Sequence, residues 1–428
     1  MQNNQNQSAR DNYKWLLLLF LWSAFFLHQG TRQIFNAVIP QIQNTFGVDS
    51  VKMGAVGAVF TLTYGICAPL SGFAGDFLSR KLMVVVGLAV FCSGIFFSGF
   101  VGCVGLMIVF YGLLNGAGQA FYYPAACSLL GQLHEKTRAT ALAIHQTALY
   151  AGIVFCSCVS GFLADIPSVE LPSGIFGGSL EGWRLPFIIF GAAGILWAVV
   201  LVFFMRNTKP AHAHRSDGAA SFKNALSAMF RKSAALSLAL GFGLYIYVDC
   251  GFKTWAPAFM QERFSMDAAQ AATNAVLWHY IGAFFGVMLG GRFADRLAKR
   301  HRHIRFETNI AGLLIGAPFV YLTATADSAF ACCAYMLLFG FGRGVYDSNL
   351  FASLFDVVAP RYRASASGLM LCFAFIIGST SPVVLGWLRD EFSSGYAIAS
   401  LAFFYVASAL VIFAARMLFF DRDYEHQS

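Results

Sequence analysis

Five charged side chains stand inside long apolar stretches of this 428-residue sequence: Arg32, Asp249, Lys253, Arg343 and Asp347. An ion at the centre of a bilayer costs about 2.5 to 3.5 kcal/mol on insertion scales, so each one needs a partner or a function. A guanidinium binds a carboxylate or phosphate through a planar set of donors, and a carboxylate can take up a proton. These residue types therefore predict binding of an organic anion, coupled to the movement of an ion.

The spacing of these ions relates them to one another. His28 and Arg32 are four residues apart and share a helix face. Asp249 follows Arg32 by 217 residues, at the equivalent position of a repeated second half. We therefore expect Arg32 and Asp249 to face one central cavity, in which Arg32 binds the substrate anion. An ion pair with a purely structural role is the alternative.

Arg343 and Asp347 are also four residues apart and share a helix face. They either neutralise each other or form a site in which the substrate competes for Arg343. In the second case, a proton on Asp249 or Asp347 would free an arginine for a substrate carboxylate.

Further polar side chains suit a hydroxylated substrate. His145, Gln146 and Tyr150 supply mixed donors and acceptors, and a histidine titrates near neutral pH. A packed, hydrogen-bonded core histidine is the alternative for His145. The predicted substrate-binding residues are Arg32, His28, Tyr64, His145, Gln146, Tyr150, Arg343 and Asn349. The predicted proton or ion coupling residues are Asp249, Asp347 and His145.

The elements that position these residues are apolar segments. The sequence is 58% hydrophobic and 12% charged, which excludes a water-soluble globular protein. Stretches of spanning length occur at 15–39, 51–74, 82–103, 105–131, 139–164, 183–205, 234–260, 268–294, 306–326, 329–357, 364–388 and 396–420. We predict an all-α membrane protein with twelve transmembrane helices.

The charge distribution predicts the orientation in the membrane. The net charge is +8, and 22 of the 29 Lys and Arg fall on one side of the predicted helices. That side is the cytoplasm by the positive-inside rule, which places both termini there. The predicted parts are a tail (1–14), a six-helix bundle (15–205), a cytoplasmic linker (206–233), a second six-helix bundle (234–420) and a tail (421–428).

The two halves of the chain repeat each other. The turn from Gly72 to Lys81 recurs from Gly291 to Arg300, and Arg138-Ala-Thr-Ala recurs as Arg363-Ala-Ser-Ala. Duplicated halves predict a pseudo-twofold axis along the membrane normal, with a binding site near the middle of the bilayer.

The repeated turn resembles the signature of the major facilitator superfamily, Gly-x-x-x-Asp-Arg-x-Gly-Arg-Arg. Phe77 and Ser79 replace its first Arg and its Gly, whereas the second copy keeps Asp295 and Arg296. The resemblance implies two pseudo-symmetric six-helix bundles and a motif Asp that locks the cytoplasmic gate by holding a helix end and a basic residue. The gate residues that it implies are Asp76, Arg80, Asp295, Arg296 and Arg300.

Two segments resemble particular branches of the major facilitator superfamily. Arg32 stands eight residues before Pro40, as in organophosphate exchangers and anion:cation symporters, in which this Arg contacts the substrate anion. Those exchangers carry a second Arg where this chain has Asp249, which favours a monoanion with proton or cation coupling. The run from His145 to Gly152 is similar to permeases for sialic acid and other sugar acids, which share His-x-Thr-x-x-Tyr-x-Gly.

The sequence therefore predicts a secondary active transporter that imports a sugar acid or other carboxylate by proton-coupled symport with alternating access. Sodium is the alternative ion. An organophosphate/phosphate antiporter, a lysolipid-type carrier and a non-transporting membrane sensor are the alternative functions. No nucleotide loop, metal-ligand cluster or nucleophile set stands out, so we expect no enzyme activity, cofactor, metal or nucleic-acid partner. The expected setting is a monomer in a bacterial cytoplasmic (inner) membrane, surrounded by lipid.

Overall fold

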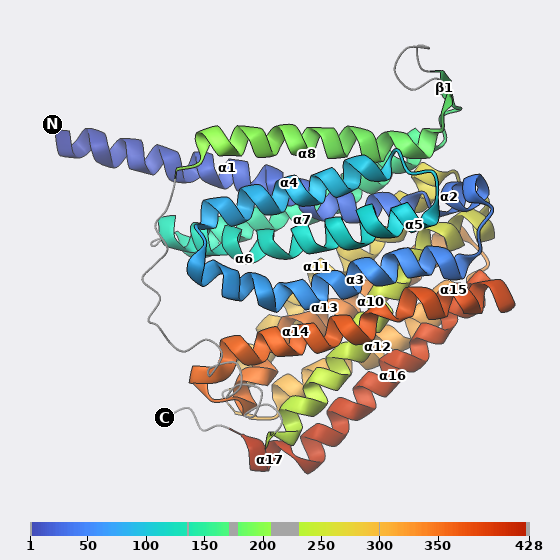
Figure 1. The fold of residues 1–428 in the computed structure, drawn as a ribbon. Helices are drawn as coiled ribbons and strands as arrows, with labels where there is room; N and C mark the ends of the chain where they lie inside the picture. The colour runs from blue at the N-terminus through green and yellow to red at the C-terminus, as the bar shows by residue number, and fades with distance from the viewer. Residues whose placement is uncertain (1, 135–136, 171–178, 207–230, 299, 425–428) are drawn as a thin grey trace. The chain divides into compact units, whose positions relative to one another are not determined.

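The computed structural model describes residues 2–134, 137–170, 179–206, 231–298 and 300–424, and these are almost entirely helical (Figure 1). The side chains of 2–12, 73, 75–77, 139, 170, 361 and 364 lie outside that description. By their contacts the residues form two compact units, Met1–Phe46 with Leu70–Ala213 (unit 1) and Gly47–Pro69 with His214–Ser428 (unit 2).

Unit 1 is built around α1, which packs along α7, and around α4, which packs between α6 and α8. Its core consists of buried aliphatic and aromatic side chains such as Phe25, Phe91 and Tyr122. Its elements are α1 (Gln2–Ala37), α2 (Ile39–Phe46), the end of α3 (Ser50–Phe77), α4 (Arg80–Ser98), α5 (Val104–Met107), the π-helix η1 (Ile108–Asn115), α6 (Gly116–Leu133), α7 (Arg138–Ala164), β1 (Val169–Glu170), β2 (Ser179–Leu180), η2 (Gly182–Arg184) and α8 (Leu185–Phe204).

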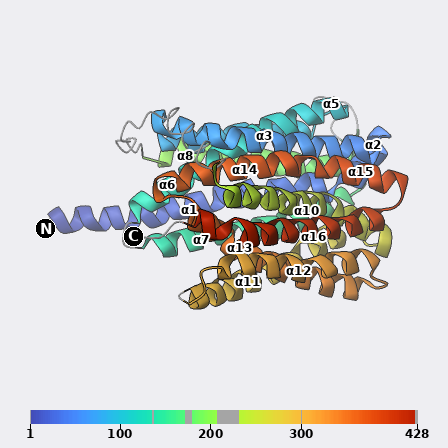
Figure 2. The same ribbon diagram turned by 90° about the horizontal axis from the view of Figure 1, so that it is seen from below.

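Unit 2 contains the first part of α3 and the helices from α10 onward. α10 packs against both α14 and α16, and these three helices lie side by side in Figures 1 and 2. The elements are α10 (Ser233–Phe264), α11 (Ala268–Ala298), α12 (Ile304–Thr325), α13 (Ala329–Val357), η3 (Pro360–Tyr362), α14 (Arg363–Ser379), α15 (Ser381–Glu391), α16 (Ser394–Leu418) and α17 (Phe420–Asp423).

Eleven helical segments in the described part of the chain are long and apolar enough to cross a membrane. They correspond to the second to twelfth spans predicted from the sequence. Residues 15–37 of the first predicted span are helical too, as part of α1, but the polar residues His28, Gln29 and Arg32 follow its apolar stretch and lower its hydropathy. The sequence analysis did not predict the short antiparallel ladder that pairs Val169 with Leu180.

Most of the predicted linker, residues 207–230, lies outside the described residues, so the division into bundles 15–205 and 234–420 stays a prediction. The contacts add one unexpected feature. Residues 47–69 come early in the chain, but they group with the helices of unit 2.

Glycines bring α11 and α13 into close contact, as their four-residue spacing indicates. A Cβ atom on Gly282 would lie 1.9 Å from the carbonyl oxygen of Leu337, and one on Gly286 would lie 2.1 Å from that of Phe341. Neither backbone can move away easily, because both belong to packed helices.

We therefore expect Gly282→Ala to lower the thermal unfolding temperature of the detergent-purified protein. Overpacking of this kind costs about 1 to 3 kcal/mol. Gly368→Ala is the matched control, because nothing lies within 4 Å of a Cβ at that position. An unfolding temperature that falls equally in both variants would contradict this account of the packing.

Candidate substrate and ion-coupling sites

Four of the five predicted membrane ions lie together in unit 2. Asp249 and Lys253 are on α10, and Arg343 and Asp347 are on α13. Lys253 Nζ donates to Asp249 Oδ2 at 2.8 Å, and Arg343 Nη1 lies 2.7 Å from Asp249 Oδ1. Asp249 is therefore held between two cations. We call these four residues, with Tyr245, the charged cluster.

Arg343 connects both carboxylates of the charged cluster. Its Nε lies 3.4 Å from Asp347 Oδ2, so the predicted i, i+4 pair does form a contact. The same Nε donates to the Tyr245 hydroxyl at 2.9 Å, and that hydroxyl donates to Asp347 Oδ1 at 2.6 Å. The Tyr245 hydroxyl therefore bridges Arg343 and Asp347 by two hydrogen bonds.

A neighbouring helix completes the surroundings of Arg343. Its Nη1 lies 2.6 Å from His279 Nε2 on α11. Because a guanidinium only donates, Nε2 must accept, so the imidazole carries its proton on Nδ1 and is neutral. The Tyr280 ring lies 5.5 Å from the Arg343 guanidinium and 5.6 Å from Lys253 Nζ, within range of cation–π attraction.

Charge is balanced within the charged cluster, with two carboxylates and two cations. The four side chains differ in exposure: 12% for Asp249 and for Arg343, 22% for Lys253 and 34% for Asp347. Asp347 is therefore the most accessible of the four, and its one contact with a cation is the longest.

Arg32 forms a second polar site, in unit 1. Its Nε donates to Gln119 Oε1 on α6 at 2.5 Å, and the Gln119 amide donates to Asn115 Oδ1 at 2.9 Å. The Tyr111 hydroxyl donates to the Arg32 carbonyl oxygen at 3.0 Å. Gln119 and Asn115 were not among the predicted site residues.

The histidines of unit 1 are packed in its core. His28 is fully buried, and its Nε2 lies 3.0 Å from the backbone oxygen of Gln119. His145 is 1% exposed and stacks on Phe25, with ring centroids 4.4 Å apart. Each ring is packed among other side chains of unit 1, and His145 also borders a pocket.

That pocket has a volume of about 370 Å³ and opens between α6 and α7. Its polar lining includes His145, Gln146, Tyr123 and Arg138. The Arg138 guanidinium lies against the bare backbone of Gly131, where a Cβ would come within 3.1 Å of Nε. The pocket therefore brings the predicted substrate-binding residues His145 and Gln146 together with Arg138. The sequence analysis named Arg138 only as part of the repeat between the two halves.

The contacts of both units follow the sequence repeat. Arg32 and Asp249 occupy equivalent places in α1 and α10, and Gln119 and Arg343 occupy equivalent places in α6 and α13. In each unit the first of these helices bonds to the second through that pair, Arg32 with Gln119 and Asp249 with Arg343. The equivalent contact is thus a hydrogen bond between a cation and a neutral amide in unit 1, and an ion pair in unit 2.

A model of the Major Facilitator Superfamily matches residues 21–382. The chain belongs to this superfamily. It is accordingly a multi-pass membrane transporter and not an enzyme.

Several superfamily members resemble this facilitator over most of its length. A probable galactarate/D-glucarate transporter (GudP) of Bacillus subtilis is 25% identical over 418 residues, which cover 90% of this chain and 88% of the relative. A probable sulfoacetate transporter (SauU) of Cupriavidus necator is 24% identical, covering 86% of each chain. Protein spinster of Drosophila melanogaster is 23% identical over 88% of this chain, and the match spans only 62% of that longer protein.

A solved structure shows the same fold. The bacterial homologue of the human lysosomal transporter spinster, in an inward-facing and unoccupied conformation, superposes with a TM-score of 0.83 at 22% identity, over 97% of this facilitator and 99% of that chain. The predicted major facilitator fold is thereby confirmed.

Three predicted substrate-binding residues of this facilitator lie outside the contacts described above. Asn349 is buried and its amide donates to Ser348 Oγ at 2.8 Å and to the Gly290 carbonyl at 3.5 Å, so it belongs to the contact of α13 with α11. The Tyr64 ring packs edge-on against Phe375 of α14, with centroids 5.1 Å apart. Tyr150 is half-buried on α7.

The predicted gate residues of this facilitator stay a prediction. The Asp76 side chain lies outside the described residues. Arg80 is the first residue of α4, which Ser79 caps by accepting from the Leu82 amide. Asp295, Arg296 and Arg300 are exposed, and their side chains form no hydrogen bond or ion pair within the described part of the chain.

A polar network at the other end of unit 2 was not predicted. The Ser50 amide donates to Asp390 Oδ2 at 2.8 Å, and Arg389 Nη1 donates to Ser50 Oγ at 2.8 Å. Arg389 also binds Glu262 of α10 and lies 5.0 Å from the Trp255 ring. This network attaches the beginning of α3 to α10 and α15, which explains why residues 47–69 group with unit 2.

Proposed function

We propose that this facilitator imports a small organic anion, a sugar acid or another carboxylate, by proton-coupled symport. The observation that carries the proposal is the position of Arg343 between two carboxylates, Asp249 and Asp347. A carboxylate of the substrate can replace one of them at the guanidinium with little change in local charge. The names of the relatives, which concern galactarate, D-glucarate and sulfoacetate, support an anionic substrate.

In this proposal, Asp347 is the proton site and Asp249 the fixed anchor. Asp249 has two cations within 3 Å, whereas Asp347 has one contact at 3.4 Å and a Tyr245 hydroxyl. Asp347 is also the more exposed carboxylate, so water can deliver a proton to it. A proton on Asp347 weakens its hold on Arg343, which then binds the substrate carboxylate. Loss of the proton lets Asp347 recover Arg343 and expel the substrate.

Arg32 and the pocket beside α7 are proposed as further substrate contacts. Gln119 holds the Arg32 guanidinium through Nε and offers amide groups next to it, a combination that suits a carboxylate with adjacent hydroxyls. Arg138, His145 and Gln146 line a pocket of similar chemistry near the start of α7. By the positive-inside assignment this pocket is near the cytoplasm, where it would receive the anion on release.

The setting that we propose is the cytoplasmic membrane of a bacterium, with a monomeric transporter and both termini in the cytoplasm. Two bundles would alternate access to the sites, and the turns at Asp76 and Asp295 would close the cytoplasmic side.

An organophosphate/phosphate antiporter is the second candidate, because a probable hexose phosphate transport protein of Chlamydia pneumoniae is 23% identical over 92% of this chain. Reconstituted protein distinguishes the two. We expect uptake of galactarate, D-glucarate or sulfoacetate into proteoliposomes to rise several-fold with an inwardly directed proton gradient and to need no internal phosphate. Uptake that requires internal phosphate and ignores the proton gradient would favour the antiporter.

A further inference from the structure

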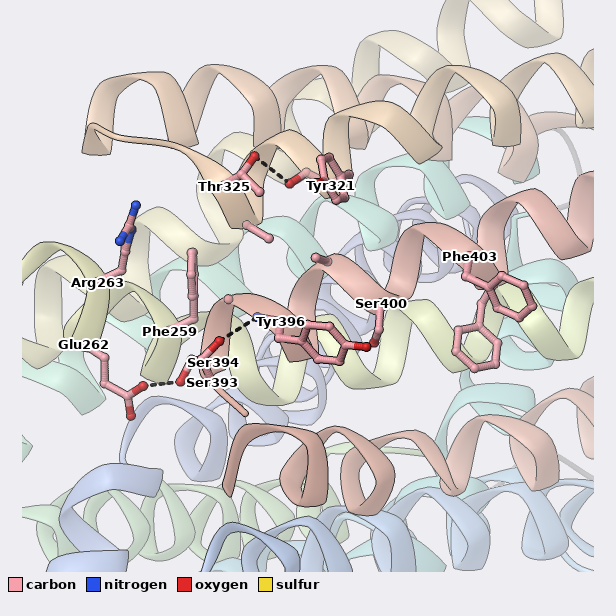
Figure 3. Close-up of a pocket in the computed structure, with 14 residues that line it drawn as sticks. Phe259, Glu262, Arg263, Tyr321, Thr325, Ser393, Ser394, Tyr396, Ser400 and Phe403 are labelled. Carbon is pink, nitrogen blue, oxygen red and sulfur yellow. Dashed lines mark hydrogen bonds between the residues drawn. The ribbon is translucent and has the colours of Figure 1, made fainter. Parts of the chain in front are cut away.

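A groove of unit 2 lies among three helix ends, those of α10 and α12 and the beginning of α16 (Figure 3). Its volume is about 970 Å³, large enough for a sizeable ligand. None of the residues of the charged cluster is among the described residues that line it. The groove is therefore a feature separate from the transport site proposed above.

The groove lies at the edge of the membrane-spanning segments. The span of α10 ends at Phe264, that of α12 ends at Thr325, and that of α16 begins at Ser394. Large aromatic side chains stand exposed there, with 52% exposure for Tyr321 and 70% for Phe403. Tyrosine at this depth is typical of the boundary between lipid headgroups and acyl chains.

Polarity changes along the groove. Figure 3 shows Glu262 and Arg263 at one end and Phe403 at the other, with Tyr396 and Ser400 between them. Such a gradient matches a molecule with a polar head and an apolar tail. It does not match a sugar acid, which is polar throughout.

The charge at the polar end favours an anionic head. Glu262 is engaged by Arg389 and by Ser394 Oγ. Arg263 has only weak partners among the described residues, the Ala326 carbonyl at 3.4 Å and the fully exposed Asp327 carboxylate at 3.7 Å. An exposed pair of this kind contributes little, so the guanidinium keeps donors for a phosphate.

We propose that this groove binds a phospholipid from the monolayer at the end of unit 2 where α10 and α12 end and α16 begins. The phosphate lies at Arg263, and an acyl chain lies along Tyr396 and toward Phe403. A phospholipid combines the anion and the tail that the two ends select, and it is the amphiphile most concentrated at this depth.

Native mass spectrometry of the detergent-purified full chain tests the site. Palmitoyl-oleoyl phosphatidylglycerol is the probe, and monogalactosyl diacylglycerol, which lacks a phosphate, is the reference lipid. We expect Arg263→Gln to lower bound phosphatidylglycerol at least threefold and to leave the galactolipid unchanged. Ser400→Trp, which fills the middle of the groove, should lower both. Arg263→Glu should also lower bound phosphatidylglycerol and leave the galactolipid unchanged. Because the Arg263 side chain is exposed, this test does not depend on whether Ser400→Trp folds.

Lys52→Gln is the matched control, because Lys52 is an exposed cation at the same end of unit 2 and also pairs with a nearby aspartate. It should leave both lipids bound as in the wild type. The proposal is overturned if Lys52→Gln lowers phosphatidylglycerol as much as the Arg263 variants do, or if a folded Ser400→Trp variant binds both lipids normally.

Discussion

Replacing Arg343 by glutamine is expected to reduce organic-anion uptake by roughly two to three orders of magnitude. The change removes the cation that we propose for the substrate and leaves Asp249 and Asp347 without their shared arginine. Removing one partner of a buried charge pair between protein and ligand costs about 2 to 5 kcal/mol of binding free energy, and about 1.4 kcal/mol corresponds to a tenfold change in affinity. Initial rates of uptake into proteoliposomes measure the effect.

Two further variants separate the loss of binding from the loss of folding. Arg343→Gln combined with Asp249→Asn removes one charge of each sign, so it should recover thermal stability without recovering uptake. Arg302→Gln is the control, because Arg302 forms an exposed pair with Asp421 at 2.9 Å and its loss should change neither property. Uptake near the wild-type level in either Arg343 variant would exclude Arg343 as the anion site.

Replacing Asp347 by asparagine is expected to abolish accumulation against a gradient while exchange persists. Asparagine keeps a hydrogen bond with Tyr245 but cannot take up or release a proton. Arg343 then stays available to the substrate throughout the cycle, so labelled and unlabelled anion still exchange across the membrane. We expect the accumulation ratio under an inward proton gradient to fall about tenfold or more, toward equality.

The control for this prediction is Asp327→Asn, which removes a fully exposed carboxylate from the loop between α12 and α13. It should accumulate substrate as the wild type does. An Asp347→Asn protein that still concentrates the anion would show that the coupling proton binds elsewhere.

The parts of the fold that depend on local sequence could be predicted. Apolar length defined the helices, and i, i+4 spacing defined the contact of Arg343 with Asp347. The four-residue spacing of Gly282 and Gly286 is typical of a helix that packs closely on another, but it does not identify α13 as that helix. These signals depend only on the geometry of one helix or on the close packing that small residues permit.

The partners of the same residues on other helices could not be predicted. The Asp249 side chain binds Arg343, 94 residues later, and Arg32 binds Gln119, 87 residues later. Periodicity shows that residues share a face but not which helix covers it. His28 shares a face with Arg32 and is nevertheless fully buried, and Asn349, on the same helix as Arg343, points to α11. The common cavity for Arg32 and Asp249 stays a prediction.

The role of residues 47–69 was also beyond the sequence analysis. Their apolar character predicted a span of the first half, whereas the hydrogen bonds of Ser50 with Arg389 and Asp390 connect partners about 340 residues apart. Asp390 lies 27 residues after Arg363, as Asp165 does after Arg138, but this repeat does not indicate Ser50 as its partner.

The central claim is that one anion enters together with a proton that Asp347 carries. The most direct measurement adds substrate outside proteoliposomes that contain a pH-sensitive dye, with no gradient imposed. The account predicts internal acidification that follows substrate entry in the wild type and is absent in Asp347→Asn, although exchange continues in that variant. Substrate entry without acidification in the wild type, or undiminished acidification in Asp347→Asn, would contradict it.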